Sequence, residues 1–471
     1  MLAGTRSARQ PVQSATEGDM MTTRGVILAA GLGLRMKSET PKVLHPLGER
    51  ALIHYVLEAV TEATGSLPTL VIGPGADRIR EEVGSAAQFV VQEESLGTAH
   101  AVRQVKNLLA GQAEYILIAY GDMPLLTAPT LRNLTEAAAR HPGPLTFLVA
   151  RGGEARGFGR VLRDPLGRVR KVVEEALATP EELAIQEINL GVYCVREAWL
   201  WEALTRIGPS PKGEYYLTDL VELASESGAG AQAILVPDPD EGIGINTRVH
   251  LAQAEAALRR RTNQRWMEAG VTLFDPATTY IGPRVDIGAD TVILPNTQLE
   301  GETRIGRDCR IGPNTVIRQS SIGSGCRIEA SVLEQATLEE QVQVGPFAHL
   351  RSGAHLASGV HMGNFGEVKN SYLGPRTKMG HFSYLGDAKV GAEANLGAGM
   401  VTCNFDGQRK NPTEIGEGAF IGSDTMLVAP IRVGKGARTG AGSVVTRDVP
   451  DGTLAVGAPA RQMRRLQPRE K

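Results

Sequence analysis

The sequence predicts a chain of two parts, an N-terminal α/β domain with a doubly wound parallel sheet and a C-terminal parallel β-helix. Two observations lead to this fold class. From residue 24 to about 248, short apolar runs alternate with helical segments, as in a parallel sheet covered by helices. From Ile281 to about Val449, an aliphatic residue instead recurs every six positions, and this period is the hexapeptide signature of a β-helix.

Composition narrows the class of protein. The chain has 471 residues, a formal net charge of -2 and four cysteines. This length allows two or three domains, and the near-neutral charge gives no indication of a nucleic-acid partner. The sparse cysteines, none in a CxxC pair, indicate free thiols in a reducing compartment. No apolar run approaches the roughly 18 residues of a membrane helix. We therefore expect a cytoplasmic protein with no nucleic-acid or membrane partner.

The polar segment 1–23 has no apolar core, so we expect a disordered extension rather than a secretory signal. The first domain, 24–248, then opens with a strand at Gly25–Ala30, a glycine-rich turn and the basic residues Arg35 and Lys42. Such a turn lets backbone N–H groups surround phosphates. It is not a Walker loop, and Met36 replaces the third glycine of a dinucleotide fingerprint.

The same domain should continue with strands at Thr69–Gly73, Gln88–Gln92 and Tyr115–Tyr120, and with a helix at Gly97–Leu109. Asp122 follows the apolar run YILIAY directly. Because ligands bind beyond the carboxyl ends of parallel strands, Asp122 is placed where a metal could be held. Taken alone, an aspartate there is more often a turn or helix cap.

A helical linker is expected over 249–270, which is rich in Ala, Leu, Gln and Arg and ends at Gly270. Its run Arg259–Arg261 indicates a solvated helix face rather than a nucleic-acid site. We expect it to act as a rigid arm between two independent domains.

The β-helix should occupy 271–471. Three hexads make one triangular coil of about 18 residues, with the aliphatic side chain inside. The following residue turns a corner, where we expect glycine because it tolerates positive φ. The aliphatic–glycine pairs begin at residues 281, 287, 305, 311, 373, 379, 385, 415, 421 and 433. His349, His355 and His361 are spaced by six, so they should lie on three different faces and not share a metal within one chain.

The string LAAGLGLRM, followed by PKVLH and by the hexapeptide region, resembles the bifunctional N-acetylglucosamine-1-phosphate uridylyltransferase / glucosamine-1-phosphate N-acetyltransferase family (GlmU type). The resemblance runs from about residue 24 to about 455. It implies a Rossmann-like nucleotidyltransferase domain and a left-handed parallel β-helix. It also implies a homotrimer that makes UDP-N-acetylglucosamine from glucosamine-1-phosphate, acetyl-CoA and UTP.

For the first domain, the resemblance implies Mg²⁺ held by Asp122 and Asn246, with Lys42 and Arg35 balancing charge during uridylyl transfer. The choice of Glu174 over Glu175 rests on alignment alone, and the segment 212–219 is interpreted as mainly structural. The implied UTP and UDP-N-acetylglucosamine ligands are Leu28, Ala29, Ala30, Gly31, Lys42, Gln92, Gly97, Thr98, Tyr120, Gly121, Asp122, Gly157, Glu174, Asn189 and Asn246.

For the β-helix, the resemblance implies His381 as general base, with Glu367 orienting it. The implied contacts of glucosamine-1-phosphate are Arg351, Lys369, Tyr384 and Asn395. Those of acetyl-CoA are Ala398, Asn404, Phe405, Ser423, Ala441 and Arg461. The insertion at 404–407 should form a loop over the site.

Two departures from the family affect the coenzyme site. Phe405 stands where the family commonly has Tyr. Ala458 lies near a position where the family has a coenzyme-contacting Arg, and Arg461 is the nearest replacement.

Other interpretations stay open at this stage. The chain could be a sugar-1-phosphate nucleotidylyltransferase whose β-helix serves only for assembly, or a regulatory subunit. His381, Glu367, Arg351 and Lys369 argue against inert stacking, which needs only aliphatic residues and turns.

Overall fold

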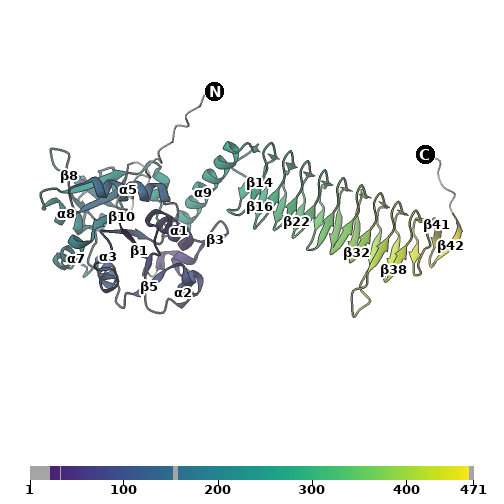
Figure 1. The fold of residues 1–471 in the computed structure, drawn as a ribbon, viewed down its shortest axis with the longest axis horizontal. Coiled ribbons are helices and arrows are strands. Elements are labelled where there is room, and N and C mark those ends of the chain that lie inside the picture. Colours follow the sequence, from purple (N-terminus) through teal and green to yellow (C-terminus); the bar gives the residue numbers. More distant parts are fainter. Residues whose placement is uncertain (1–21, 32, 152–156, 466–471) are drawn as a thin grey trace, which may run out of the picture. The chain divides into compact units, whose positions relative to one another are not determined.

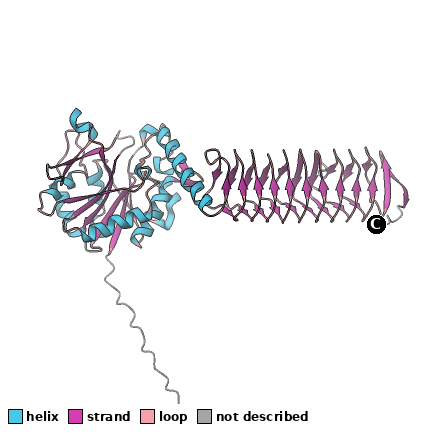
Figure 2. Cartoon of the chain, turned by 90° about the horizontal axis from the view of Figure 1, so that it is seen from above, coloured by secondary structure: helices cyan, strands magenta, loops and turns pink. Residues whose placement is uncertain are grey.

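The computed structural model describes residues 22–31, 33–151 and 157–465, so nearly all of the predicted extension 1–23 lies outside the described residues. The chain divides into two compact units, Met1–Ala254 and Glu255–Lys471. The division falls within helix α9 (Arg248–Glu268), which covers the predicted linker. Each unit is described by itself (Figures 1 and 2).

The first unit is an α/β domain, as predicted. Its strands are β1 (Thr23–Leu28), β2 (Pro46–Leu47), β3 (Arg50–Ala51), β4 (Thr69–Ile72), β5 (Gln88–Val91), β6 (Tyr115–Tyr120), β7 (Leu145–Arg151), β8 (Gly159–Arg163), β9 (Val169–Val173), β10 (Glu187–Arg196) and β11 (Ala231–Leu235). Its helices are α1 (Leu52–Thr64), α2 (Asp77–Val83), α3 (Thr98–Gln104), α4 (Lys106–Leu109), α5 (Ala128–Arg140), α6 (Pro180–Leu183), α7 (Glu197–Arg206) and α8 (Asp219–Ser225). Short 3-10 turns are η1 (Leu34–Met36), η2 (Lys42–Leu44), η3 (Gly84–Ala86), η4 (Glu175–Leu177) and η5 (Pro239–Gly242).

The main sheet has the order β11-β7-β10-β6-β1-β4-β5. Strand β1 pairs in parallel with β4 on one side and β6 on the other. The chain therefore winds outward from β1 to β5 and then crosses back to β6. This reversal between β1 and β6 opens a crevice at their carboxyl ends, where ligands bind in open α/β sheets.

Alternating side chains of the central strands serve two hydrophobic cores. Ile27 of β1 packs with α1 and α5 on one face of the sheet. Its neighbours Val26 and Leu28 pack with α3, α7 and α8 on the other. The predicted helix 97–109 is split into α3 and α4 at Val105.

The second unit is a left-handed β-helix of three sheets, whose strands are parallel except for the antiparallel pair β41 and β42 (Figure 2). The first face contains β12 (Thr272–Leu273), β15 (Val292–Ile293), β18 (Arg310–Ile311), β21 (Arg327–Ile328), β24 (Gln343–Val344), β27 (His361–Met362), β30 (Lys378–Met379), β33 (Asn395–Leu396), β36 (Phe420–Ile421), β39 (Arg438–Thr439), β41 (Thr453–Gly457) and β42 (Ala460–Arg465). The second face contains β13 (Tyr280–Ile281), β16 (Gln298–Glu300), β19 (Val316–Arg318), β22 (Val332–Glu334), β25 (His349–Leu350), β28 (Gly366–Lys369), β31 (Ser383–Gly386), β34 (Val401–Cys403), β37 (Met426–Val428) and β40 (Val444–Val445). The third face contains β14 (Asp286–Ile287), β17 (Arg304–Ile305), β20 (Ser321–Ile322), β23 (Thr337–Leu338), β26 (Ala354–Leu356), β29 (Ser371–Leu373), β32 (Ala388–Val390), β35 (Thr413–Ile415) and β38 (Ile431–Val433).

The aliphatic column predicted from the hexads forms the core of this prism. Ile293, Leu299 and Ile311 are fully buried, and their counterparts in later coils join the same cluster. The C-terminal half of α9 covers the first coil: Asn263 donates Nδ2–H bonds to the carbonyls of Pro276 at 2.8 Å and Thr279 at 3.0 Å. A solenoid needs such a cover because its end coil has no neighbour.

We predicted that glycine follows the aliphatic residue because it tolerates positive φ, and for most of the hexads this reason is wrong. Gly288 and Gly306 do not have positive φ. The left-handed corner lies two residues later, at Asp290 (φ 63°) and Asp308 (φ 57°). Glycine is needed for space instead, because a Cβ on Gly288 would lie 2.6 Å from the Arg307 backbone nitrogen of the next coil. Gly312, with φ 99°, does follow the predicted reason.

The three histidines spaced by six lie in β25, β26 and β27, one on each face. Each contacts a side chain of the preceding coil. His349 contacts Glu334 at 3.2 Å, His355 contacts Glu339 at 3.0 Å, and His361 contacts Gln343 at 3.3 Å. They therefore take part in three separate side-chain pairs. Within the described residues, no helix is long and apolar enough to cross a membrane.

Candidate active sites

A cavity of about 340 Å³ lies at the carboxyl ends of β1 and β6, at the reversal of strand order. Many residues predicted for nucleotide binding line it: Leu28, Ala29, Ala30, Gly31, Lys42, Gln92, Gly97, Thr98, Tyr120 and Asp122. The predicted Gly121 lies between two of these residues, and its N–H donates to the carbonyl of Leu28 at 2.9 Å. The sheet topology thus brings together segments that are far apart in the sequence.

Lys42 joins the two residues predicted as metal ligands. Its ammonium forms a short ion pair with Asp122 and donates to Asn246 Oδ1 at 3.0 Å. The Asp122 carbonyl also accepts from the Ile245 N–H at 2.9 Å, which fixes the Asn246 segment beside Asp122. One carboxylate and one amide oxygen therefore converge on a single cationic atom.

Gln92 is almost completely buried at the edge of this cavity, with 4% of its surface exposed. Its Nε2 donates to the Gly97 carbonyl at 3.1 Å and contacts His100 Nδ1 at 3.0 Å. These contacts use the amide hydrogens, so the carbonyl oxygen is the group left to accept a bond from a ligand. Gly97 has φ 99°, and a Cβ there would lie 2.5 Å from the Tyr215 carbonyl oxygen.

Behind Tyr120 lies a buried polar cluster that contains two further predicted residues. Glu174 accepts from the Thr218 hydroxyl at 2.8 Å, and burial raises the pKa of its carboxyl group. Asn189 donates to the Tyr193 hydroxyl at 2.7 Å and accepts from the Gly191 N–H at 3.0 Å. A Cβ on Gly191 would lie 2.3 Å from the Tyr120 ring, so the strand carrying Asn189 packs directly against Tyr120.

The structure separates the two candidate glutamates, Glu174 and Glu175. Glu175 accepts from the backbone N–H of the predicted Gly157 at 2.7 Å. Glu174 instead lies close to Tyr120. Burial raises the pKa of the Tyr120 hydroxyl, and the charge of Glu174 raises it further. Arg35 is exposed and is not among the residues that line the cavity.

Two cavity residues were missed because the segment 212–219 was interpreted as structural. Tyr215 does have that role: its carbonyl accepts from the Ala99 N–H at 2.9 Å, and its N–H donates to the Leu96 carbonyl at 2.8 Å. Its neighbours Glu214 and Tyr216 line the cavity. The glutamate followed by two consecutive tyrosines in the string GEYY was the available signal.

A groove of about 690 Å³ opens on the first face of the β-helix. His381 lies in it, in the bend after β30, and is exposed. The predicted residues Asn395, Ala398, Ser423 and Ala441 also line the groove. His361, Lys378 and Phe420 were not predicted and line it as well.

The predicted sugar-phosphate residues Arg351, Lys369 and Tyr384 lie on the second face. The adjacent Lys410 ammonium, followed by Arg351, lowers the pKa of Lys369. Cations held this close favour an anionic ligand. Lys410 was not predicted, because it belongs to the insertion and falls outside the hexad pattern.

Glu367 contacts a different partner from the one expected. It accepts from Arg351 Nη1 at 2.9 Å, and it lies in register with His349 and Tyr384. Among the described residues, no hydrogen bond joins Glu367 to His381. Glu367 lies on the second face, whereas His381 lies in the bend between β30 of the first face and β31 of the second.

The insertion after β34 forms a closed loop that projects from the prism (Figure 1). Asp406 accepts from the Arg409 N–H, from Asn411 Nδ2 and from the Gln408 N–H, which lowers its pKa to about 2. The predicted Asn404 is buried and donates to Asp387 at 2.6 Å, whereas Phe405 is 62% exposed. At the other end, Arg461 pairs in register with Val456, which lies beside the groove residue Gly440.

Comparison with known proteins agrees with both units. Residues 25–206 match the model of the MobA-like NTP transferase domain, and residues 284–319 and 412–447 match that of the bacterial transferase hexapeptide (six repeats). The chain is 46% identical to the bifunctional protein GlmU of Heliobacterium modesticaldum, over 92% of this chain and 94% of the relative. It is 45% identical to the bifunctional protein GlmU of Pelobacter propionicus, over 93% and 96%.

The chain belongs to the GlmU family. This confirms the family and the fold class predicted from the motifs. It also confirms the prediction of a bifunctional transferase, with a nucleotidyltransferase domain and a hexapeptide transferase domain. The alternative of a regulatory subunit is not supported.

The thermal stability of this GlmU-family chain should depend on the protonation of Asp219, next to the buried cluster behind the nucleotide cavity. Burial, and then the charges of Glu222 and Glu174, raise the pKa of Asp219 from 3.8 to about 6. Because the folded state binds this proton more tightly than the unfolded chain, the stabilisation is complete below pH 3.8 and is lost as the pH rises to about 6. We expect Asp219→Asn to gain thermal stability over the wild type at about pH 7.5 but not at about pH 4, measured by calorimetry. Glu222→Gln removes one of the charges and should show a smaller gain, whereas equal Asp219→Asn differences at both pH values would contradict the assignment.

Proposed function

We propose that this chain makes UDP-N-acetylglucosamine in two steps, one in each unit. The β-helix transfers the acetyl group of acetyl-CoA to glucosamine-1-phosphate, and the first unit then joins the product to UMP from UTP and releases pyrophosphate. One observation supports this most strongly: each unit has its own hollow, and each hollow is lined by residues predicted for that unit's reaction.

In the first unit, we infer that the sugar phosphate oxygen attacks the α-phosphorus of UTP. Lys42 is placed to balance the charge that develops on the phosphates. The Gln92 carbonyl oxygen is free to accept from the pyrimidine N–H. Glu174 and Asn189 would recognise the sugar, and they hold the Tyr120 side of the cavity in place.

Asp122 and Asn246 fit a divalent cation, since their oxygens already converge on the cationic Lys42 nitrogen. An aspartate and a neutral amide leave positions for water and phosphate oxygens, which is how Mg²⁺ is usually bound. When bound, Mg²⁺ would neutralise phosphate charge. Lys42 would then be free to turn toward the phosphates.

In the β-helix, we infer that the amine of glucosamine-1-phosphate attacks the thioester carbonyl of acetyl-CoA, so that an amide forms, the C–S bond breaks and coenzyme A leaves. His381 takes the proton that the amine loses, since a neutral imidazole nitrogen can act as a general base. Arg351, Lys369 and Lys410 would bind the sugar phosphate. Glu367 positions Arg351, rather than His381, through their ion pair.

We infer a homotrimer formed through the second face. Outward-pointing apolar side chains gather there, namely Val316, Val332, Val401, Met426 and Val444. Flat prism faces suit closed cyclic packing.

Native mass measurement should give three times the mass of one chain. Met426→Glu should reduce this mass because it would bury an unpaired carboxylate, and Lys389→Glu on the third face should not. A monomeric wild type would refute this assembly.

Two assays test the function directly. Release of coenzyme A from acetyl-CoA and glucosamine-1-phosphate reports the first reaction. Release of pyrophosphate from UTP and N-acetylglucosamine-1-phosphate reports the second. Pyrophosphate release without any acetyl transfer would favour the other candidate, a nucleotidylyltransferase whose β-helix only assembles the protein.

The four free cysteines support a cytoplasmic location.

A further inference from the structure

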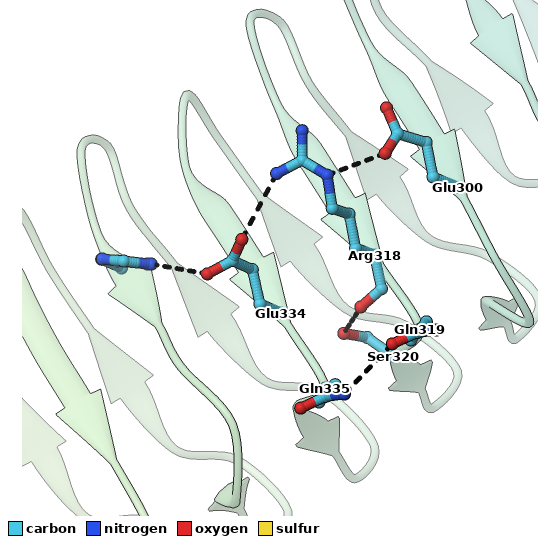
Figure 3. A network of polar contacts seen from close by, with 7 residues as sticks. Glu300, Arg318, Gln319, Ser320, Glu334 and Gln335 are labelled. Carbon is cyan, nitrogen blue, oxygen red and sulfur yellow. Dashed lines mark hydrogen bonds and ion pairs between the residues drawn. The ribbon is translucent and has the colours of Figure 1, made fainter.

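The three faces of the β-helix carry different patterns of charge. On the second face, opposite charges alternate along the prism and pair. Arg318 bonds to Glu300 at 2.7 Å and to Glu334 at 3.4 Å (Figure 3). Glu334 in turn contacts His349 at 3.2 Å. Nearly every charge in this ladder is thus matched by a neighbour one coil away.

The third face mixes both signs without a long run of either. Its outward positions include Asp286, Arg304, Lys389, Glu414 and Arg432. Asp286 lies in register with Arg304, and Lys389 with Glu414. A carboxylate therefore stands beside a cation on this face as well.

The first face is different, because its charged outward positions hold cations alone. We call five of these cations, all except Arg461, the basic row: Arg310, Arg327, Lys378, Arg438 and Arg464. From β15 to β42, no outward position of this face carries an acidic side chain. In the described part of the chain, none of the five forms an ion pair, although Arg438 lies 6.0 Å from the centre of the Phe420 ring.

The row is unfavourable for the fold itself. Arg310 lies directly in register with Arg327 on the next coil, and like charges in such opposed positions destabilise a sheet. The neighbouring faces show that this prism can pair its charges. A face that keeps a row of unpaired cations is expected where an anionic ligand approaches.

The groove with His381 opens on this same face. Lys378 belongs both to the basic row and to the groove lining, whereas Arg310 and Arg327 lie outside it. Arg327 is three strand steps from Lys378 through Gln343 and His361, or about 14 Å at 4.8 Å per step. At this distance, Arg327 can attract a donor toward His381 without contacting it. Electrostatic attraction reaches about 30 Å at 0.01 M salt but only about 8 Å at 0.15 M.

We infer that the basic row is an electrostatic guide for the phosphate-bearing acyl donor, in which Arg310 and Arg327 speed its association with the groove without contacting it once bound. This inference rests on the proposed acetyl transfer. The donor is a polyanion by its chemistry, and a cleft lined by one sign of charge raises the association rate of an oppositely charged ligand. Arg310 and Arg327 act on the encounter alone, so the chemical step is independent of them.

The test is the double variant Arg310→Gln/Arg327→Gln. The association rate constant of a fluorescent etheno-adenine coenzyme A is measured by stopped flow at rising salt. We expect it to fall about three- to tenfold at about 0.01 M salt and to match the wild type at about 0.5 M salt. The kcat of acetyl transfer should stay unchanged. Equal association rates of the two proteins at low salt would overturn the inference.

Two controls isolate the guide from a structural effect. Arg304→Gln removes an exposed cation from the third face in the strand before Arg310, and it should leave the rate unchanged. Acetyl-pantetheine has no phosphate, so its kcat/KM should be equal in wild type and double variant. A loss with this neutral donor would show that the arginines act through the fold and would overturn the inference. Failure of the wild type to acetylate with either donor would refute the proposed function instead, while the association measurement would still report on the row.

Discussion

Replacement of His381 by alanine is expected to lower the rate of acetyl transfer by about 10²–10⁴-fold and to leave uridylyl transfer unchanged. The attacking amine must lose a proton, and His381 is the imidazole in the bend that enters the groove. The side chain is exposed, so its removal should change the free energy of unfolding by less than about 0.5 kcal/mol. Initial rates of coenzyme A release and of pyrophosphate release measure the two activities on the same sample.

His361→Ala is the matched control, because this second histidine lines the same groove and contacts Gln343. We expect at most a severalfold change in its acetyl transfer. Unchanged acetyl transfer in His381→Ala would remove His381 from the mechanism. Similar losses in both histidine variants would point to the shape of the groove rather than to proton transfer.

The β-helix was predictable because its pattern follows from geometry alone. A triangular coil buries one side chain per face, so the period of six persists wherever coils stack. Ile287, Ile305 and Ile421 are buried in the way that this period requires. The role of glycine was not predictable in the same way. It depends on how closely the backbone of the next coil approaches, and this distance leaves no mark on the sequence.

The candidate sites were predictable where a motif keeps its residues close together in the chain. The turn after β1 and the string around His381 are of this kind. Residues that reach a site through tertiary contacts were missed, as with Glu214 and Tyr216 in the nucleotide cavity and Lys410 beside Lys369. The structure gives Glu367 a different partner, Arg351, for a related reason, since a sequence separation gives the face of the prism but not which neighbouring side chain a residue bonds to.

Lys42→Ala should lower uridylyl transfer by about ten- to a hundredfold while acetyl transfer stays intact. A charge-assisted contact with a phosphate is worth about 1.5–3 kcal/mol, and each 1.4 kcal/mol corresponds to about a factor of ten. The change also leaves the Asp122 carboxylate without its cationic partner. Pyrophosphate release at saturating UTP measures the loss, and coenzyme A release from the same preparation reports the other unit.

Arg35→Ala is the control for this variant, because Arg35 carries the same charge in the same turn but is exposed outside the cavity lining. We expect a smaller loss there. The comparison is decisive because the chain forms two compact units, so a local defect in one need not reach the other. Equal losses of both activities in Lys42→Ala would indicate misfolding, and a loss in Arg35→Ala as large as that in Lys42→Ala would show that net charge near the turn matters more than the contact of Lys42 with Asp122 and Asn246.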